Sequence, residues 1–329
     1  MNLLKKIIYW KLSLQFFLIT YIRNKLYDAG LIKSLSFEVP VISVGNLAVG
    51  GTGKTPMVEF LIDHFSDTHI VSVLSRGYKR NSSGFILVSE KDNAKSIGDE
   101  PFQFFSKFKN INVAVDKNRR RGINRLIERG SDLILLDDAF QHRRVKPTYS
   151  ILLSEYENLY YKDYLMPKGK LRESKKGAIR ADCIIITKCP SNISSKAKDN
   201  IIKLIKPLSH QKLFFSSIVY SKNIFSLNGS KSLHQLKGQH INLVTGIVNS
   251  EGLKKYLDEL GLIVHHHAYP DHHAYSKKDI GFFSDKTIIT TEKDFTKLRT
   301  MDINNLFYLP IKTKIHEHEN FLTHMSLKM

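Results

Sequence analysis

Residues 41–56 of the chain, VISVGNLAVGGTGKTP, place a glycine-rich turn between an apolar run and a helical pattern. Glycines let backbone N–H groups turn toward phosphate oxygens, and the N-terminus of the following helix adds a positive dipole. In such a loop Lys54 reaches the terminal phosphates of a nucleoside triphosphate, and Thr55 binds Mg²⁺. A glycine-rich turn with a chance GKT sequence is the alternative. The predicted phosphate-binding residues are Gly50, Gly51, Thr52, Gly53, Lys54 and Thr55.

A second apolar run, LILLDDAFQHR, ends in Asp137 and Asp138. A carboxylate at the carboxyl end of a buried strand lies beside a phosphate-binding loop and holds Mg²⁺ directly or through water. Two adjacent acidic residues alone also fit an ordinary turn. Because they accompany the glycine-rich loop, we predict a nucleotide site in which Asp137 and Asp138 bind the metal ion.

Two further charged motifs lie where predicted strands end or predicted helices begin. The motif SRGYKR follows a strand, which places Arg76 and Tyr78 on the rim that carries the phosphate loop. The motif IGDEP puts Asp99 and Glu100 at a helix start, where capping of the helix is the simple explanation. A second interpretation makes Asp99 a catalytic base, because an acceptor hydroxyl must lose its proton near the γ-phosphate.

Cationic and histidine-rich stretches complete the candidate site. Most charges in DKNRRRG and MPKGKLRESKK are expected to face solvent, but the guanidinium groups of Arg119 and Arg172 suit a phosphate clamp. The segment VHHHAYPDHHAYS contains five histidines, yet it has no cysteine and no acidic residue at the spacing of a zinc helix. We therefore interpret Asp271 and His272 as a carboxylate-oriented histidine in a loop rather than as part of a zinc site.

Apolar, β-rich runs alternate with helical patterns along almost the whole chain. Continuous Ile, Val and Leu runs favour strands buried on both faces, and hence an α/β fold with a largely parallel sheet. The predicted strands are 39–44, 70–74, 111–115, 132–136, 149–153, 182–187, 241–245, 262–267, 287–290 and 305–309. The predicted helix starts are Lys54, the neighbourhoods of Pro101 and Asn118, the residue after Ser250, and Glu292.

The polar stretch 221–240 is the expected boundary between two domains. We predict an N-terminal membrane-interface helix at 1–30, a P-loop core at 31–220 and a smaller C-terminal α/β domain at 221–329. The fold class is therefore α/β, with a P-loop NTPase core and a mostly parallel sheet.

The N-terminal segment carries the uncharged run LSLQFFLITYI between Lys11 and Arg23. A helix that spans a bilayer needs ~20 apolar residues, so this run is short for a single span. Trp10, Tyr9 and Tyr21 suit the membrane interface, and the basic residues suit lipid headgroups. A helix buried against the domain core is the alternative.

Composition limits the partners of this 329-residue chain. It is 42% hydrophobic and 25% charged, which is typical of a globular protein, and its net charge is +19. Such a charge favours anionic partners: nucleic acid, an acidic membrane surface or a phosphorylated substrate. The two cysteines, Cys183 and Cys189, offer no disulfide framework and match no zinc motif, which fits a reducing cytosol.

Seven motifs follow one another along the chain: VGNLAVGGTGKTP, LSRGYKR, GDEP, DDAFQHR, MPKGKLRES, PDHH and TTEKDFTKL. Together they resemble the signature blocks of the tetraacyldisaccharide 4'-kinases of the lipid A pathway in Gram-negative bacteria. The resemblance runs from the N-terminal helix to about residue 298. It implies transfer of the ATP γ-phosphate to the 4'-hydroxyl of an acylated glucosamine disaccharide 1-phosphate. It also implies a P-loop fold and attachment to the inner-membrane lipid surface on its cytoplasmic face.

The resemblance also assigns roles to residues. It implies that Asp99 is the general base and that His272 is its partner in a dyad. Ala48 and Ala139 replace the threonine and glycine that are usual in the family, and both replacements are small. The catalytic residues implied in this way are Lys54, Asp99, Arg119, Arg172, Glu173 and His272. The implied substrate-contacting residues are Arg76, Tyr78, Glu100, Gln141 and His142.

Two other functions fit part of the sequence. A nucleic-acid-dependent P-loop ATPase would explain the net charge, but the chain has no aromatic-interleaved basic groove and such an enzyme needs no interfacial helix. A membrane-attached nucleotide-binding switch would explain the loop and the helix, and the motif ITKCP faintly resembles a base-reading loop. The kinase accounts for more of the motifs, and it predicts ATP and Mg²⁺ as ligands and no nucleic acid as partner.

Overall fold

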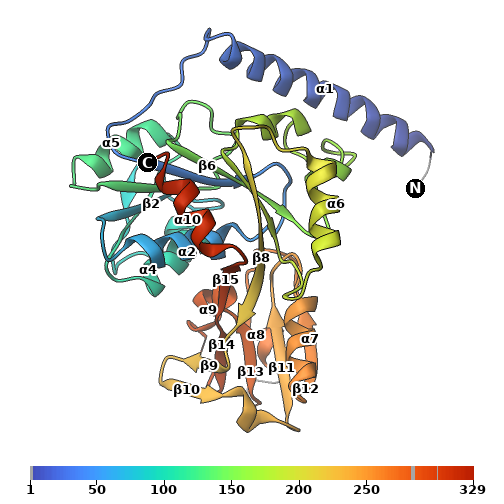
Figure 1. The fold of residues 1–329 in the computed structure, drawn as a ribbon. Helices are drawn as coiled ribbons and strands as arrows, with labels where there is room; N and C mark the ends of the chain where they lie inside the picture. The colour runs from blue at the N-terminus through green and yellow to red at the C-terminus, as the bar shows by residue number, and fades with distance from the viewer. Residues whose placement is uncertain (1–2, 283–285, 302) are drawn as a thin grey trace.

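The computed structural model describes residues 3–282, 286–301 and 303–329, which form two units, one above the other in Figure 1. Each unit is built around its own β-sheet. The α-helices are α1 (Leu3–Asp28), α2 (Lys54–Phe65), α3 (Ala94–Ile97), α4 (Asp99–Lys107), α5 (Arg119–Ile127), α6 (Ser195–Ile205), α7 (Glu251–Glu259), α8 (Lys277–Ile280), α9 (Glu292–Leu298) and α10 (His318–Ser326). Short 3-10 helices are η1 (Tyr160–Lys162), η2 (Lys175–Arg180) and η3 (Leu233–Leu236).

The larger unit contains a nine-stranded sheet in the order β15-β8-β7-β6-β1-β5-β2-β4-β3. Within the described residues, its pairs are parallel except at the two edges, where β15 pairs with β8 and β3 pairs with β4 in antiparallel fashion. The mostly parallel sheet predicted from the apolar runs is confirmed. Its strands are β1 (Val41–Asn46), β2 (Val71–Ser75), β3 (Ile86–Leu87), β4 (Asn112–Val115), β5 (Leu133–Asp137), β6 (Tyr149–Glu155), β7 (Cys183–Thr187), β8 (Lys212–Tyr220) and β15 (Ile311–Ile315).

Helix α2 anchors the C-terminal end of the glycine-rich loop on the sheet. Its apolar residues recur on one face, and Met57, Val58, Leu61, Ile62 and Phe65 are all buried against the sheet. This spacing matches the 3.6-residue period of an amphipathic helix. The strand–loop–helix order expected for a phosphate-binding loop is therefore present, with β1 before the loop and α2 after it.

The acidic pair is brought beside the loop by the register of β1 and β5. Val44 of β1 lies opposite Asp137 of β5 in a parallel pair. The chain after β5 passes so close to β1 that a Cβ added to Gly45 would lie 2.7 Å from the Cβ of Phe140. Because carboxyl ends of parallel strands meet at one edge of a sheet, the loop after β1 and the acids after β5 share that edge.

The smaller unit contains a six-stranded sheet in the order β10-β9-β14-β13-β11-β12. The strands β11, β12, β13 and β14 are parallel, and their apolar residues form cores with helices α7 and α9. The strands are β9 (Asn223–Ser226), β10 (Gly229–Ser232), β11 (His240–Thr245), β12 (Ile263–Ala268), β13 (Ile288–Thr291) and β14 (Leu306–Leu309).

The chain returns to the larger unit at its C-terminal end, which differs from the predicted domain limits. Strand β15 pairs with β8, with Ile311 opposite Tyr220. Phe321 and Met325 of α10 are buried in the core of the larger unit. The predicted boundary at residue 221 therefore does not separate the two sheets, and we propose a division in which residues 31–220 and 311–329 form the larger unit. Residues 283–285 and 302 of the predicted C-terminal domain lie outside the described residues.

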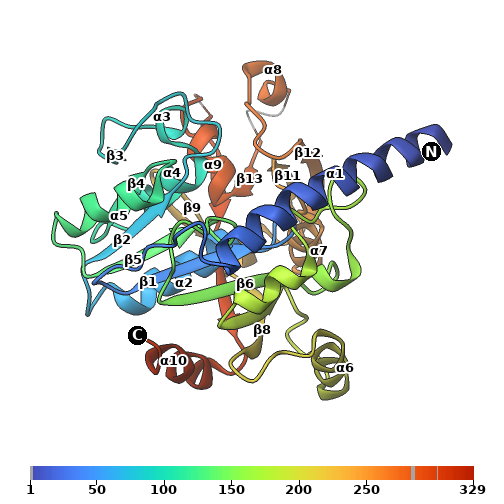
Figure 2. The same cartoon turned by 90° about the horizontal axis from the view of Figure 1, so that it is seen from above.

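Helix α1 lies across the outside of the larger unit, and its N-terminal end projects outward (Figures 1 and 2). Large apolar side chains along it face solvent, including Trp10 at 60% and Ile19 at 68% exposure. One face of α1 contacts the larger unit, where Thr20 is buried, but the helix as a whole is not buried in the core. Among the described residues, no helix combines the length and the apolarity needed to cross a membrane.

Candidate active site

The glycine-rich loop is fixed by residues at the ends of two strands of the larger sheet, β1 and β7. Gly50 and Gly53 have φ angles of 116° and 85°, a region that residues with side chains rarely adopt. Asn46 at the end of β1 donates from Nδ2 to the hydroxyl of Thr52 at 2.6 Å. Thr187 at the end of β7 donates from its hydroxyl to the carbonyl of Thr52 at 2.8 Å. These contacts hold the loop in place, with Lys54 as the first residue of α2.

Asp137 is a buried carboxylate with one unused oxygen. Its Oδ2 accepts a hydrogen bond from Ser75 at 3.0 Å, whereas its Oδ1 is buried without a hydrogen-bond partner among the described residues. Burial, with the nearby charges of Asp138 and Glu100, raises the pKa of Asp137 to about 6. A buried oxygen of this kind fits a cation ligand, because carboxylates and hydroxyls are the ligands that Mg²⁺ prefers.

Asp138 is already paired with two cations. Arg172 donates to both of its carboxylate oxygens, at 3.0 and 2.6 Å, and the ammonium of Lys54 lies 3.8 Å from Oδ1. Burial opposes its ionisation, but the charges of Lys54 and Arg172 outweigh burial and hold the pKa of Asp138 below its ordinary value. Arg172 also donates to the backbone carbonyl of Asn46 at 3.1 Å. The acidic pair therefore divides into a free oxygen on Asp137 and an ion-paired Asp138.

Asp99 and His272, 173 residues apart in sequence, are in direct contact. The Nδ1 of His272 lies 2.9 Å from Oδ2 of Asp99. His272 has a φ of 60°, so a left-handed turn sets its ring orientation, and Tyr78 packs edge-on against that ring. Burial opposes ionisation of Asp99, but the hydrogen bond from His272 and the charges of Lys297 and Lys293 outweigh it and lower the pKa of Asp99.

Two lysines of α9 belong to the same cluster, and the sequence motifs predicted no role for them. The ammonium of Lys297 lies 3.2 Å from Oδ2 of Asp99. Lys293 lies 3.1 Å from Glu100 and 3.2 Å from Nε2 of His272. Their spacing of four residues puts both on one helix face, within the motif TTEKDFTKL that carries the family resemblance. The four-residue spacing within this motif is the sequence feature from which the two lysines could have been predicted.

Two predicted site residues, Arg119 and Glu173, are held in hydrogen-bond networks. Arg119 is buried, and it donates to the carbonyls of Asp116 at 3.0 Å and Asp137 at 2.8 Å. Glu173 is fully buried and accepts hydrogen bonds from three side chains, at 2.8 Å from Asn24, 3.1 Å from Gln141 and 2.7 Å from Arg180. The contacts of Arg119 and Glu173 keep the ends of strands and loops in place.

His142 is a neutral imidazole in this environment. Burial lowers its pKa to about 4, with further lowering by the charges of Arg119, Arg76, Arg144 and Arg23. It therefore offers one donor and one acceptor nitrogen at neutral pH, rather than a cation.

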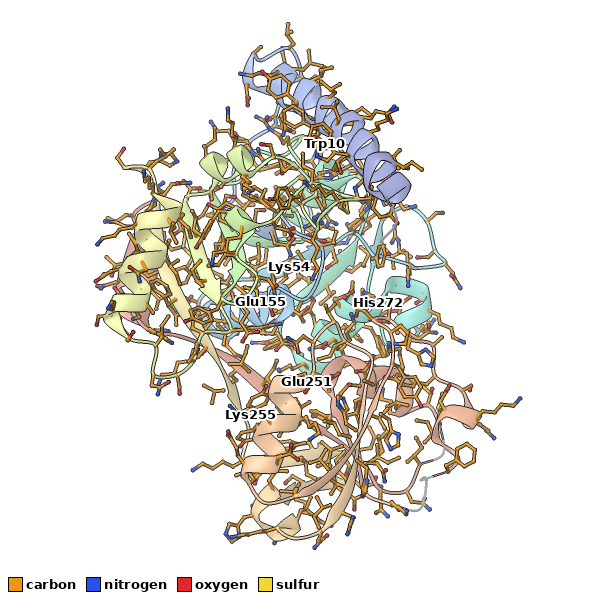
Figure 3. All side chains as sticks on the ribbon, turned by 90° about the vertical axis from the view of Figure 1, so that its right-hand side faces the viewer. Trp10, Lys54, Glu155, Glu251, Lys255 and His272 are labelled. Atoms are coloured by element: carbon orange, nitrogen blue, oxygen red, sulfur yellow. The ribbon has the colours of Figure 1, made fainter. Side chains whose placement is uncertain are left out.

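One cleft of 1260 Å³ between the two units joins these groups. Figure 3 shows Lys54, Glu155 and His272 in the region between the units, with Glu251 and Lys255 on the facing helix α7. Asp99 and Glu173 do not line the cleft, and Asp99 is linked to it through His272. The predicted site residues that line it are Gly50, Gly51, Thr52, Gly53, Lys54, Thr55, Arg76, Tyr78, Glu100, Arg119, Asp137, Asp138, Gln141, His142, Arg172 and His272.

Comparison with known proteins gives a consistent result. The sequence profile of the family described as tetraacyldisaccharide-1-P 4'-kinase matches residues 5–329. A tetraacyldisaccharide 4'-kinase of Flavobacterium johnsoniae is 44% identical over 98% of this chain and 96% of its own length. The corresponding protein of Bacteroides thetaiotaomicron is 41% identical over 91% of this chain and 86% of its own length.

A solved structure agrees with the sequence relatives. The crystal structure of LpxK from Aquifex aeolicus in complex with ATP superposes on this chain with a TM-score of 0.79. The two sequences are 30% identical, and the match covers 97% of this chain and 98% of that chain. The likeness therefore extends through both units and is not confined to the phosphate loop.

Proposed function

Because this chain belongs to the tetraacyldisaccharide 4'-kinase family, we propose how its own residues carry out that family's reaction. The chain is an ATP-dependent kinase of lipid A biosynthesis. It moves the γ-phosphoryl group of ATP to the 4'-hydroxyl of tetraacyldisaccharide 1-phosphate. A bond forms between the 4'-oxygen and the γ-phosphorus, the bond to the β-phosphate oxygen breaks, ADP leaves, and the hydroxyl proton passes to the protein.

Residues of the phosphate loop hold the nucleotide in this proposal. The backbone N–H groups of Gly50 to Thr55 surround the phosphates, and Lys54 neutralises the charge that develops on the transferred group. Thr55 and Asp137 would hold Mg²⁺, supported by the free buried oxygen of Asp137. When bound, Mg²⁺ would offset the negative charge of the phosphate groups. Asp138, also predicted to bind the metal, is paired with Arg172, and its two carboxylate oxygens keep further lone pairs for the ion.

The contact between His272 and Asp99 is the observation that carries the mechanism. Phosphoryl transfer needs little covalent help, but the acceptor proton must leave as the new bond forms. A carboxylate that accepts a hydrogen bond from Nδ1 of an imidazole fixes the ring and its proton positions. We assign proton acceptance to this pair, with His272 at the cleft wall and Asp99 ionised behind it.

Helix α1 gives the enzyme a route to a substrate that stays in a lipid layer. Its exposed Trp10 and neighbouring apolar side chains, together with a net charge of +19, suit an anionic lipid surface. We propose that α1 lies in the interface of the inner membrane on its cytoplasmic face. Enzyme and lipid then meet in two dimensions, which raises their effective concentration.

The direct test is product analysis with full-length protein. Wild-type protein, ATP, Mg²⁺ and tetraacyldisaccharide 1-phosphate in mixed micelles should yield a lipid with one added phosphate. Tandem mass spectrometry should locate it on the sugar that does not carry the 1-phosphate. Lys54→Ala should lower turnover by at least ~100-fold, because a preorganised charge at the transferred group is lost. Lys109→Ala, which removes an exposed lysine outside the cleft, should retain wild-type turnover. A folded Lys54→Ala variant with near-normal turnover would contradict the assignment.

A further inference from the structure

Arg23 is the residue through which helix α1 reaches the cleft. Among the described residues of α1, it alone lines the cleft between the two units. Its Nε is buried and has no hydrogen-bond partner among the described residues, and one terminal nitrogen lies 3.2 Å from the side-chain oxygen of Asn24. A guanidinium with a buried, unpaired N–H group is suited to bind an anion, because burying a donor without an acceptor costs free energy.

The position of Arg23 is fixed by the folded body of the enzyme. The next residue, Asn24, donates to buried Glu173 at 2.8 Å, and its carbonyl accepts a hydrogen bond from Arg143 at 2.8 Å. Arg143 also pairs with Asp28 at 2.8 Å in the last turn of α1. This end of α1 is therefore anchored by the residues that follow Arg23, although much of the helix is exposed.

Arg23 shares the cleft with two further arginines. Arg76 and Arg119 line the same cleft, and the charges of all three arginines act on the neutral His142. Within the described part of the chain, no carboxylate lies at ion-pairing distance from Arg23 or Arg76, whereas Lys54 at the phosphate loop faces Asp138. Arg119 is held by the carbonyls of Asp116 and Asp137, so Arg23 and Arg76 are the arginines that indicate a second anion site apart from the loop.

We propose that Arg23 binds the 1-phosphate of the lipid substrate and so makes the membrane helix a part of substrate recognition. This inference rests on the proposed function, in which the nucleotide phosphates already occupy the glycine-rich loop. The lipid arrives from the side where α1 lies, and its phosphate is its charged group. Arginine suits this role because its planar fork donates two hydrogen bonds to a phosphate.

The test compares two substrates and three variants of the full-length enzyme in mixed micelles. The substrates are tetraacyldisaccharide 1-phosphate and the same disaccharide without its 1-phosphate. The variants are Arg23→Ala, Arg23→Lys and the matched control Lys25→Ala, which removes an exposed positive charge from the same helix outside the cleft. Thermal melting of each variant shows whether it is folded. Turnover of the wild type is checked first, so a failure of the proposed function is seen separately.

We expect Arg23→Ala to raise the KM for the phosphorylated lipid about tenfold, with the KM for ATP unchanged, since one charge-assisted contact is lost. The lipid KM of Arg23→Lys should lie between those of wild type and Arg23→Ala. The lipid KM of Lys25→Ala should stay within about twofold of wild type. With the substrate that lacks the 1-phosphate, wild type and Arg23→Ala should have equal KM values. The proposal is overturned if Arg23→Ala and Arg23→Lys leave the lipid KM unchanged. It is also overturned if Arg23→Ala raises the KM for the lipid that lacks the 1-phosphate, or if the KM for ATP rises instead.

Discussion

The pair formed by Asp99 and His272 can be tested by removing each partner and then both. Oδ2 of Asp99 has two partners, Nδ1 of His272 at 2.9 Å and the ammonium of Lys297 at 3.2 Å. His272→Ala removes one charge-assisted hydrogen bond and leaves the lysine contact in place. A hydrogen bond of this class contributes about 1.5–3 kcal/mol, which corresponds to a roughly 10- to 150-fold fall in kcat.

Loss of the carboxylate should cost more than loss of the imidazole. A general acid or base raises the rate of a reaction roughly 10²- to 10⁴-fold, so Asp99→Ala should lower kcat by a factor in that range. The KM for ATP should change little, because the glycine-rich loop holds the nucleotide. If the two side chains pass one proton as a unit, the double variant should be scarcely worse than Asp99→Ala alone.

The pH profile gives an independent readout of the same contact. The pKa of Asp99 is lowered because the hydrogen bond from His272 and the lysine charges outweigh burial. Removing His272 leaves burial in place and takes away the strongest of the lowering contributions, so the pKa of Asp99 should rise. The proposed mechanism needs ionised Asp99, and the ionised form is lost as pH falls through the pKa of Asp99. The acid limb of kcat/KM should therefore move to higher pH in His272→Ala.

The assay is initial-rate phosphorylation of the lipid in mixed micelles, from acidic to neutral pH, at saturating ATP. His273→Ala is the matched control, because His273 contacts Asp279 at 3.4 Å and does not line the cleft. It should keep wild-type kcat and the wild-type pH profile. Multiplicative losses in the double variant, or an acid limb that stays in place, would refute the coupled pair.

Two further predictions concern stability and membrane attachment. Lys107→Met should destabilise the fold by about 3–5 kcal/mol at pH 8, because it leaves buried Glu59 without its ion pair at 2.7 Å. Burial already raises the pKa of Glu59 to about 7, so the loss should shrink as pH falls below that value and the carboxyl is protonated; urea unfolding at both pH values measures it. Deletion of residues 1–28 should move the protein from membrane to soluble fractions on cell fractionation, and a truncated chain that does not fold would show that α1 is needed for folding instead.

The parts of the fold that could be predicted are those with local signals. Each of the ten predicted strands has a counterpart within a residue or two of its expected limits, because continuous apolar runs are typical of strands buried on both faces. Helices α2, α4, α5, α7 and α9 begin at or near the predicted starts. The phosphate loop and the acidic pair followed from the same rule, since both come at the carboxyl ends of buried parallel strands.

The parts that escaped prediction depend on distant pairing. Strand β15 has the alternating sequence IKTKI at a sheet edge, and it pairs with β8 some ninety residues earlier. Nothing local in that pentapeptide says which sheet it joins, so the return of the C-terminal segment was missed. Asp99 and His272 are likewise 173 residues apart, and only the family resemblance placed them together before the structure did.

The type of a residue predicts its function poorly when burial in the fold determines which groups its side chain contacts. Arg119 and Arg172 were singled out together for the same chemical reason, a guanidinium that suits phosphate. In the structure Arg119 is buried and holds the carbonyl of Asp137, whereas Arg172 is partly exposed and forms a bidentate pair with Asp138. Sequence gives the donor geometry of both residues, but only the fold decides which carbonyl or carboxylate each one meets.

The division of the site between two sheets explains why so many charges lie at their contact. The larger unit contributes the phosphate loop and Asp99, and the smaller unit contributes His272 and the lysines of α9. Lys107 joins the units through both Glu59 and Glu292, at 2.7 and 2.9 Å. Ion pairs of this kind gain little net stability, because desolvation offsets their attraction, but an unpaired member is costly. They therefore favour one arrangement of the two units over others, and in that arrangement His272, bonded to Asp99, lines the cleft that also holds the phosphate loop.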